Sequence, residues 1–406
     1  MRINALFFVT AGLILFFVCQ SSIKRTSVEK GEYGFDLTFL GKELKVVELV
    51  NGDARMVVVP KYGGRVMTSS SRGLKGHSNG WINYDLITSQ KTDHYSNPYG
   101  GEERLWLGPE GGQFSVFYAK GDAAGKGKWR VPAPLDHEDF HIKRMDSESI
   151  TLDKDFELEN KSGNKFKVRI TRNLTLLDNN KIKNNLRFVP GKSINVVGYQ
   201  SDNRLENIGD KAWNKESGIL SIWILSMLKA SPAVTVILPY RHSGDGKIFT
   251  DYFGNIPNDR LKVTDNAVLF RVDGNYRSKI GIPSQRAVPY IGSYDAKHKI
   301  LTVIEYALSN NQMYVNSLLE NPQKNPFSGD AVNSYNDGPR VDGSQIGQVY
   351  ELETSSPAAF LKPGQEITHM RRIYHFTGNE EDLDGVSKSL LKVSLEEIKN
   401  AFNSLN

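Results

Sequence analysis

Two glutamates spaced two residues apart are the clearest candidates for acid–base chemistry in this chain. Glu351 and Glu353 lie in the short run 348–353, which has the composition of a β-strand, so both side chains would project from one face. Adjacent carboxylates repel each other, and partial burial would raise the pKa of one of them. Such a group can serve as a general base, although a solvated strand face also explains an isolated pair.

A second candidate is the glycine-rich stretch 97–113, which contains Arg104, Trp106 and Glu110. An aromatic ring can stack on the C–H bonds of a sugar while carboxylate and guanidinium groups bind its hydroxyls. The structural alternative stays open, with glycines in tight turns, Arg104 paired to a nearby glutamate and Trp106 in the core. The stretch lacks the Gly-Lys-Ser/Thr ending of a phosphate-binding loop.

The histidines give weaker signals. His137 and His141 match the zinc motif His-Glu-x-x-His, which works only on a helix. Pro132 and Pro134 stand just upstream, and in a strand the two imidazoles would lie about 13 Å apart. A zinc hydrolase is therefore the least favoured hypothesis, and we expect neither a metal nor another cofactor.

His242 precedes a glycine-rich turn at 243–246, a position where binding groups often occur, although an ordinary surface histidine is the more common explanation. Two long stretches, 70–113 and 318–346, lack a strand pattern but are rich in aromatic residues, so we expect ordered loops that line a cleft. Asn336 and Asp337 lie in the second stretch and are candidate ligand-binding residues.

The elements that must position these groups are mostly strands. Residues 44–50 and 55–60 flank an Asn-Gly turn and predict a hairpin, and residues 166–176 alternate apolar and polar side chains. Helix is expected only at the end, where Ser394 and Glu397 form a capping-box pattern. The chain therefore predicts an all-β sandwich or barrel with a short C-terminal helical segment. Other short strands are expected at 114–118, 149–153, 219–225, 234–238, 268–272, 300–306, 348–353 and 367–376.

The amino-acid composition indicates a globular protein. The chain has 406 residues, is 39% hydrophobic and 24% charged, and carries a formal charge of +5 spread evenly along its length. Such values are typical of a globular protein, and the absence of a basic block argues against nucleic-acid binding. We expect one large domain over residues 36–406.

The N-terminal residues 1–19 resemble a signal segment. Arg2 is followed by an apolar run from Ala5 to Val18, which is too short to span a bilayer comfortably. Cys19, the only cysteine, ends the run, as the lipidated residue of a bacterial lipoprotein would. Val18 departs from the small residue usual there, and simple secretion is the alternative. We expect an exported, periplasmic or cell-surface protein anchored to a membrane through lipid, with residues 20–35 as a tether.

The two ends of the domain resemble a known family. Leu-Glu-Thr-Ser-Ser-Pro-Ala-Ala at 352–359, Leu-Lys-Pro-Gly-Gln at 361–365 and Tyr-His-Phe at 374–376 are similar to the C-terminal pattern of the galactose mutarotase (aldose 1-epimerase) family. Residues 57–66, with their Gly pair, resemble that family's first strands. The resemblance spans roughly residues 44–376.

This resemblance implies a β-supersandwich with a carbohydrate cleft, in which a Glu base and a His acid open and close an aldose ring. Glu353 matches the base. Ser355 replaces the family's Gln, and residues 206–213 lack the expected histidine, so His242 would have to supply the acid from another position. The fold also serves as a non-catalytic sugar-binding module.

Two hypotheses therefore stay open: an aldose epimerase that interconverts sugar anomers, and a non-catalytic glycan-binding lipoprotein. In the first, Glu353 and His242 are catalytic. In both, the expected partner is a carbohydrate. The six residues expected to bind it are Arg104, Trp106, Glu110, Asn336, Asp337 and Glu351.

Overall fold

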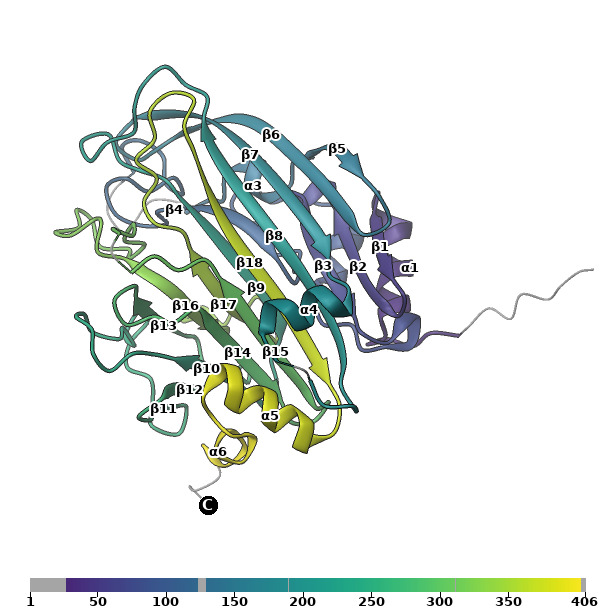
Figure 1. Ribbon diagram of the computed structural model, residues 1–406. Coiled ribbons are helices and arrows are strands. Elements are labelled where there is room, and N and C mark those ends of the chain that lie inside the picture. Colours follow the sequence, from purple (N-terminus) through teal and green to yellow (C-terminus); the bar gives the residue numbers. More distant parts are fainter. Residues whose placement is uncertain (1–26, 123–128, 189, 311, 403–406) are drawn as a thin grey trace, which may run out of the picture.

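Three antiparallel sheets make up most of the molecule (Figure 1). The computed structural model describes residues 27–122, 129–188, 190–310 and 312–402. Helices are short and lie at the margins of the sheets, so the predicted all-β class with a C-terminal helical segment is confirmed.

The largest sheet has ten strands. Its alternating face is clearest in β7, where Phe166, Val168 and Ile170 are buried and Lys165 and Lys167 are exposed. In spatial order its strands are β11 (Leu261–Val263), β12 (Ala267–Arg271), β10 (Val234–Pro239), β14 (Tyr290–Asp295), β15 (Ile300–Tyr306), β18 (Glu366–Thr377), β8 (Asn195–Asn207), β7 (Lys165–Leu176), β6 (Ser149–Glu159) and β5 (His141–Met145).

A five-stranded sheet lies behind the ten-stranded one in Figure 1. One hydrophobic core joins them, with Ile224 and Leu352 from the smaller sheet and Val168 and Ile373 from the larger. A three-stranded sheet, β1 (Val47–Asn51), β2 (Ala54–Val59) and β3 (Arg65–Ser70), stands beside them. The five strands are β13 (Ser278–Pro283), β16 (Asp330–Asn336), β17 (Val349–Ser355), β9 (Ser221–Lys229) and β4 (Arg104–Gly108).

The helices cover edges and outer faces. Ser394 and Glu397 form the predicted capping box at the start of α6. No helix in the described ranges is long and apolar enough to cross a membrane. The α-helices are α1 (Tyr33–Glu43), α2 (Tyr84–Ser89), α3 (Ala133–Asp136), α4 (Asn179–Leu186), α5 (Glu380–Leu391) and α6 (Leu395–Asn400), and the 3₁₀ helices are η1 (Pro60–Tyr62) and η2 (Gly73–Lys75).

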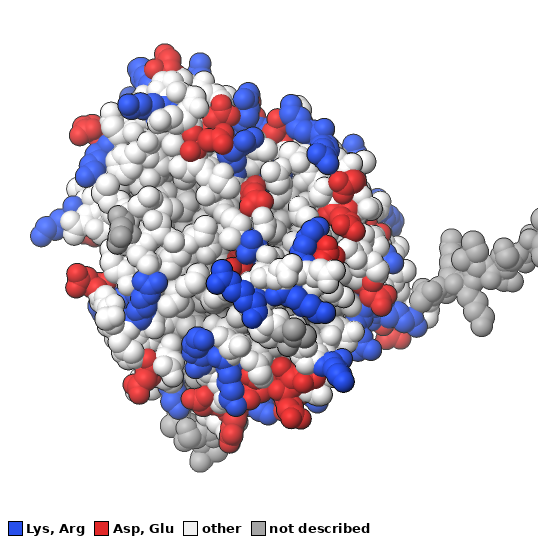
Figure 2. All heavy atoms as spheres, in the orientation of Figure 1, with Lys and Arg blue, Asp and Glu red and all other residues white. Residues whose placement is uncertain are grey.

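A layer of buried charges crosses the space between the sheets. The fully buried Arg172 and Glu103 form an ion pair of 2.6 Å. Arg371, on β18, donates from Nη2 to the carbonyl oxygen of Leu352 at 2.8 Å. Because buried polar groups are costly unless paired, these bonds hold β17 in one position against the large sheet. On the outer face seen in Figure 2, basic and acidic side chains are interspersed.

Several expected elements differ. Residues 114–118 form turns rather than a strand, because they fold back so that Phe114 stacks on Phe327. The stretches expected to be loops, 70–113 and 318–346, each contain a strand of the small sheet, β4 and β16. Helix α1 begins at Tyr33, inside the expected tether, because the Tyr33 side chain is fully buried there.

Candidate functional site

The face of the five-stranded sheet that points away from the large sheet gathers the chemically active side chains. Residues that pair directly across antiparallel strands share a face. Glu353 pairs with Asn333 and with Leu225, and Glu351 pairs with Tyr335. Across the remaining strands, Lys279 joins this face from β13, and Arg104 and Trp106 join it from β4.

Glu353 lies at the centre of this face and is fully buried. Its Oε2 accepts hydrogen bonds from the indole Nε1 of Trp223 and from Nζ of Lys279, both at 3.0 Å. Its Oε1 has no hydrogen-bond partner among the described residues. One carboxylate oxygen is therefore held by two donors, and the other is left to accept a third.

Glu351 pairs with Arg104, whose Nη2 lies 2.6 Å from Oε1. Burial raises the pKa of Glu351 to about 7; Arg104 opposes this rise and the neighbouring Glu353 adds to it. Arg104, Lys279, Glu351 and Glu353, together with Trp106 and Trp223, are called the Glu353 cluster below.

Aromatic rings form one side of the cluster. The Trp106 ring centroid lies 5.4 Å from that of Trp223 and 5.3 Å from that of Phe117. The Arg104 guanidinium stacks over Trp106 at 3.9 Å. Arg104 Nε and Trp106 Nε1 are buried without a hydrogen-bond partner in the described part of the chain. The cluster thus has two unpaired donors in addition to the unpaired Glu353 Oε1.

Glu110 approaches the cluster from the loop after β4. Burial raises the pKa of this carboxyl group and the charge of Glu353 adds to the rise, while Lys279, Arg277 and Arg104 lower it. The described residues offer its carboxylate no hydrogen-bond donor. Glu110 is anchored through its backbone N–H, which donates to Ser317 Oγ at 3.3 Å.

Tyr252 covers the opposite side of the cluster. Its hydroxyl donates to Asp330 Oδ2 at 2.5 Å and accepts from Asn333 Nδ2 at 3.1 Å. Lys279 Nζ lies 5.6 Å from the centroid of its ring. Burial raises the pKa of Asp330 to about 6, while the hydrogen bonds that Tyr252 and Asn333 donate to its carboxylate lower it.

Two hollows border the cluster. One, of about 400 Å³, reaches Asp330 and is lined by Phe249, Tyr314 and Phe327 among others. The other, of about 630 Å³, is lined by Arg277 and Phe253 among others. Each of these volumes is in the range of pockets that hold small organic ligands.

The structure brings together most, but not all, of the residues singled out from the sequence. Glu353, Glu351, Arg104 and Trp106 lie within the cluster, and Glu110 lies beside it.

The other three candidates lie elsewhere. His242 is exposed, and its Nε2 contacts the carbonyl oxygen of Asp265. Asn336 projects to the opposite face of β16, where its Nδ2 donates to the Tyr276 carbonyl oxygen. Asp337 accepts from the Tyr335 hydroxyl at 2.6 Å and from loop amides, so it organises the loop after β16.

The His-Glu-x-x-His motif does not form a zinc-binding helix. Helix α3 ends at Asp136, before His137, and His141 begins strand β5. In the described part of the chain no group of three His, Cys, Asp or Glu side chains is arranged to hold a metal ion.

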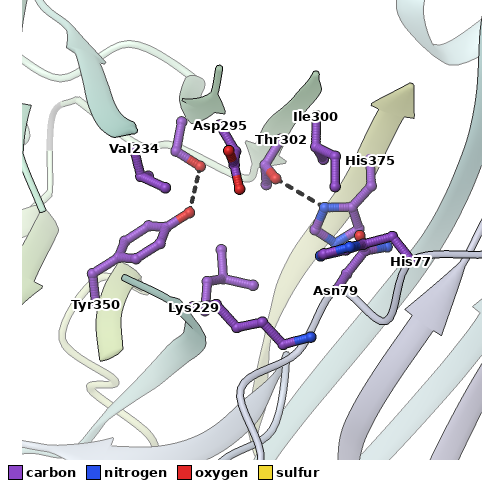
Figure 3. A pocket seen from close by; sticks show the side chains of 11 residues that line it. His77, Asn79, Lys229, Val234, Asp295, Ile300, Thr302, Tyr350 and His375 are labelled. Carbon is purple, nitrogen blue, oxygen red and sulfur yellow. Dashed lines mark hydrogen bonds between the residues drawn. The ribbon is translucent and has the colours of Figure 1, made fainter. Parts of the chain in front are cut away.

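A separate cavity inside the molecule is lined by polar groups (Figure 3). His77, Lys229, Asp295 and His375 point toward it, and burial lowers the pKa of His77 to about 3, so this imidazole is neutral at physiological pH. The volume is about 30 Å³. That space accommodates water but not a sugar, so this cavity is part of the polar interior rather than a ligand site.

Four residues of the site carried no clear signal in the sequence. Trp223 and Lys279 stand within apolar strands, where an aromatic ring or a single lysine reads as ordinary strand composition. Tyr252 and Asp330 lie in segments that mix polar and apolar residues without a regular period. Strand pairing brings Trp223, Lys279 and Asp330 to the site. Tyr252 lies outside the named strands and is held there by its hydrogen bonds with Asp330 and Asn333.

Comparison with known proteins places the chain in a family. The family model described as "Family of unknown function (DUF6786)" matches residues 31–402. No curated protein matches the chain significantly.

Solved structures of similar fold include several galactose mutarotase-like proteins. The putative aldose 1-epimerase from Escherichia coli K12 has a TM-score of 0.48 at 10% identity, covering 82% of this chain and 98% of its own. The galactose mutarotase related enzyme from Lactobacillus acidophilus has a TM-score of 0.48 at 12% identity, with coverages of 83% and 99%. The chain is thus similar to members of the family that its terminal motifs resemble, and these similarities do not extend to an activity.

Proposed function

Because this chain belongs to the family of unknown function DUF6786, its function has to come from its site, and we propose that it binds a carbohydrate at the Glu353 cluster. The observation that carries this proposal is the set of three buried, unpaired polar atoms, Glu353 Oε1, Arg104 Nε and Trp106 Nε1. Each unpaired buried group costs about 1–3 kcal/mol. A sugar hydroxyl both donates and accepts, so neighbouring hydroxyls can satisfy one acceptor and two donors together.

The aromatic rings support the same ligand class. Trp106 and Trp223 present apolar surface beside these polar atoms, and sugars combine C–H faces with hydroxyl edges. Tyr252 lies over the cluster on the side of Asp330, so ligand entry requires this side chain to move.

A glycan-binding measurement tests the proposal. Calorimetry with a panel of mono- and oligosaccharides should find a ligand for the wild type, with binding weakened about five- to tenfold in Trp106→Phe, which keeps a ring but removes Nε1. Trp106→Ala should weaken binding further. Trp213→Phe is the matched control, because Trp213 packs on Phe166 away from the cluster. Equal effects of Trp106→Phe and Trp213→Phe would contradict the proposal.

Epimerase activity is a second candidate, favoured by the different surroundings of two carboxyl groups. Glu353 is ion-paired to Lys279 and can accept the proton of an anomeric hydroxyl. Glu110, whose pKa is raised by burial, can supply a proton to the ring oxygen. The ring C–O bond then breaks to the open aldehyde, and reversal of both transfers closes the ring as either anomer. In this scheme Glu110 replaces His242 as the acid.

Nuclear magnetic resonance of anomer interconversion tests the second candidate. Wild type should accelerate the reaction on at least one aldose, and Glu353→Gln or Glu110→Gln should each reduce the rate by about 10²- to 10⁴-fold. His242→Ala should have no effect. Lack of acceleration by the wild type on every aldose would eliminate the enzyme and leave the binding proposal standing.

Export and lipid anchoring are part of the proposed function. They depend on residues 1–19, including Cys19, which lie outside the described residues. The apolar run and the cysteine at its end support an anchored lipoprotein that presents its sugar-binding face outside the cytoplasm.

A further inference from the structure

The larger hollow beside the Glu353 cluster contains two arginines that are not paired with any carboxylate of the described chain. Its volume is about 630 Å³. Its lining includes Phe253, Arg277, Arg340, Val341 and Asp342.

Arg277 is held in place without being neutralised. Its guanidinium stacks over the Phe253 ring at 3.7 Å, and its Nε donates to the Tyr335 hydroxyl at 3.3 Å. Both terminal nitrogens of Arg277 lack a hydrogen-bond partner in the described part of the chain. A guanidinium that is already oriented loses little freedom when it binds an anion.

Arg340 lies on the other side of the hollow and is exposed. Its Nη1 has only a long contact of 3.4 Å to Ser344 Oγ. Asp342 is the one acid in the lining, and its Oδ1 accepts from the backbone and hydroxyl of Ser344 at 3.0 and 2.6 Å. Two arginines against one aspartate leave the hollow with a net positive charge.

Tyr335 connects the lining of the hollow to the Glu353 cluster. Tyr335, which accepts the Arg277 bond, pairs across the sheet with Glu351 and shares its face. Arg277 also acts electrostatically on Glu110, at the edge of the cluster. A ligand unit bound at Glu353 would therefore place its neighbour in reach of Arg277.

We propose that this hollow is a second saccharide subsite that takes a sugar unit bearing a carboxylate or sulfate group, so that the ligand is an acidic oligosaccharide. The proposal rests on carbohydrate binding at the Glu353 cluster. Guanidinium groups bind carboxylate and sulfate through paired N–H donors, and the exposed apolar side chain of Val341 offers contact to the sugar ring.

The test uses the full-length protein and matched pairs of ligands. Calorimetry would compare uronate oligosaccharides with their methyl-esterified forms, and sulfated oligosaccharides with their desulfated forms. We expect at least one acidic member to bind about tenfold or more tightly than its neutral counterpart, with the preference decreasing as salt is added. The pair that shows the preference distinguishes carboxylate from sulfate.

Substitution then assigns the preference to the hollow. In Arg277→Gln and Arg340→Gln the ratio of acidic to neutral affinity should fall several-fold, and in the double variant it should approach one. Arg144→Gln removes an exposed positive charge on β5 and is the matched control. A preference that persists in the double variant, or acidic and neutral ligands that bind equally to the wild type, overturns the inference. If no saccharide of either kind binds the wild type, the proposed function itself fails.

Discussion

Lys279 determines the charge balance of the Glu353 cluster. Burial alone would lower the pKa of this lysine, but the carboxylates of Glu353 and Glu110 raise it above its ordinary value. The lysine therefore stays protonated inside the protein, 3.0 Å from Glu353 and 4.9 Å from the Trp223 ring centroid. A cation in this position is the counter-ion of the Glu353 carboxylate, whose Oε1 has no partner among the described residues and can accept a hydrogen bond.

Removing this cation should destabilise the fold strongly. Lys279→Met leaves Glu353 as a buried charge without its counter-ion, and we expect a loss of about 3–5 kcal/mol in the free energy of unfolding by urea. Lys165→Met is the control, because Lys165 and Glu157 form an exposed pair, which should contribute little to stability. Similar losses in the two variants would contradict a stabilising role for the buried Lys279–Glu353 pair.

Asp330 should make stability depend on pH. Its pKa is about 6 in the folded protein, whereas the ordinary value for an aspartate is 3.8. Between about pH 4 and 6 the unfolded chain has released this proton while the folded chain keeps it, so the free energy of unfolding falls as pH rises. The full shift in the pKa of Asp330 corresponds to a change of about 3 kcal/mol in the free energy of unfolding. Because the side chain is partly exposed, we expect a change of about 1–2 kcal/mol.

Asp330→Asn removes the titrating group while keeping an acceptor for Tyr252. Urea unfolding measured at several pH values should therefore show a flatter profile for the variant between about pH 4 and 6. An unchanged slope would mean that Asp330 ionises at its ordinary pKa in the folded state.

Among the elements, strand β17 does most to build the site. Its alternation places Glu351 and Glu353 on one face and Leu352 in the core, as the two-residue spacing in the sequence predicts. The same period in β4 places Arg104 beside Trp106. The geometry within β17 was therefore readable from local spacing, whereas β4 lies in a stretch that was expected to be a loop, and the order of the strands was not readable either.

The C-terminal helix α6 offers a local test of the capping box. Ser394 Oγ accepts from the Glu397 N–H at 3.1 Å, and the Glu397 carboxylate accepts in return from the Ser394 N–H at 2.9 Å. Ser394→Ala should lower the free energy of unfolding by about 1 kcal/mol. Ser389→Ala, at an exposed position in α5, should change it little, and equal effects would contradict a capping role.

At the scale of the whole molecule, the two main sheets are held together by charge as well as by apolar packing. Arg172 and Glu103 are fully buried, and His375 Nε2 lies 2.7 Å from Glu102 Oε1 in the same layer. Polar contacts of this kind require defined partners, so they restrict how the sheets can slide past each other. That restriction fixes the small sheet, and with it the Glu353 cluster.

The cellular placement of the molecule depends on Cys19. In a bacterial host, Cys19→Ala should lose incorporation of an alkyne-labelled fatty acid and move from the membrane to the soluble fraction. Cys19 is the only cysteine, so no other thiol can take its place. Ser21→Ala is the control and should retain the label. An unlabelled, soluble wild-type protein would support simple secretion instead.

The sequence by itself determined the properties that depend on near neighbours. These are the all-β class, the hairpin at 44–60, the capping box of α6 and the common face of Glu351 and Glu353. Each follows from the period of a strand or the first turn of a helix, which involve only a few residues.

Only the tertiary structure decided which groups meet at the site. Glu353 contacts Lys279 across 74 positions and Trp223 across 130, and Arg104 reaches Glu351 across 247. Such contacts depend on strand order, which no local pattern encodes, because a strand's own side-chain period is the same whichever neighbour it pairs with. For the same reason the exposed position of His242, far from the base it was expected to assist, could be seen only in the folded chain.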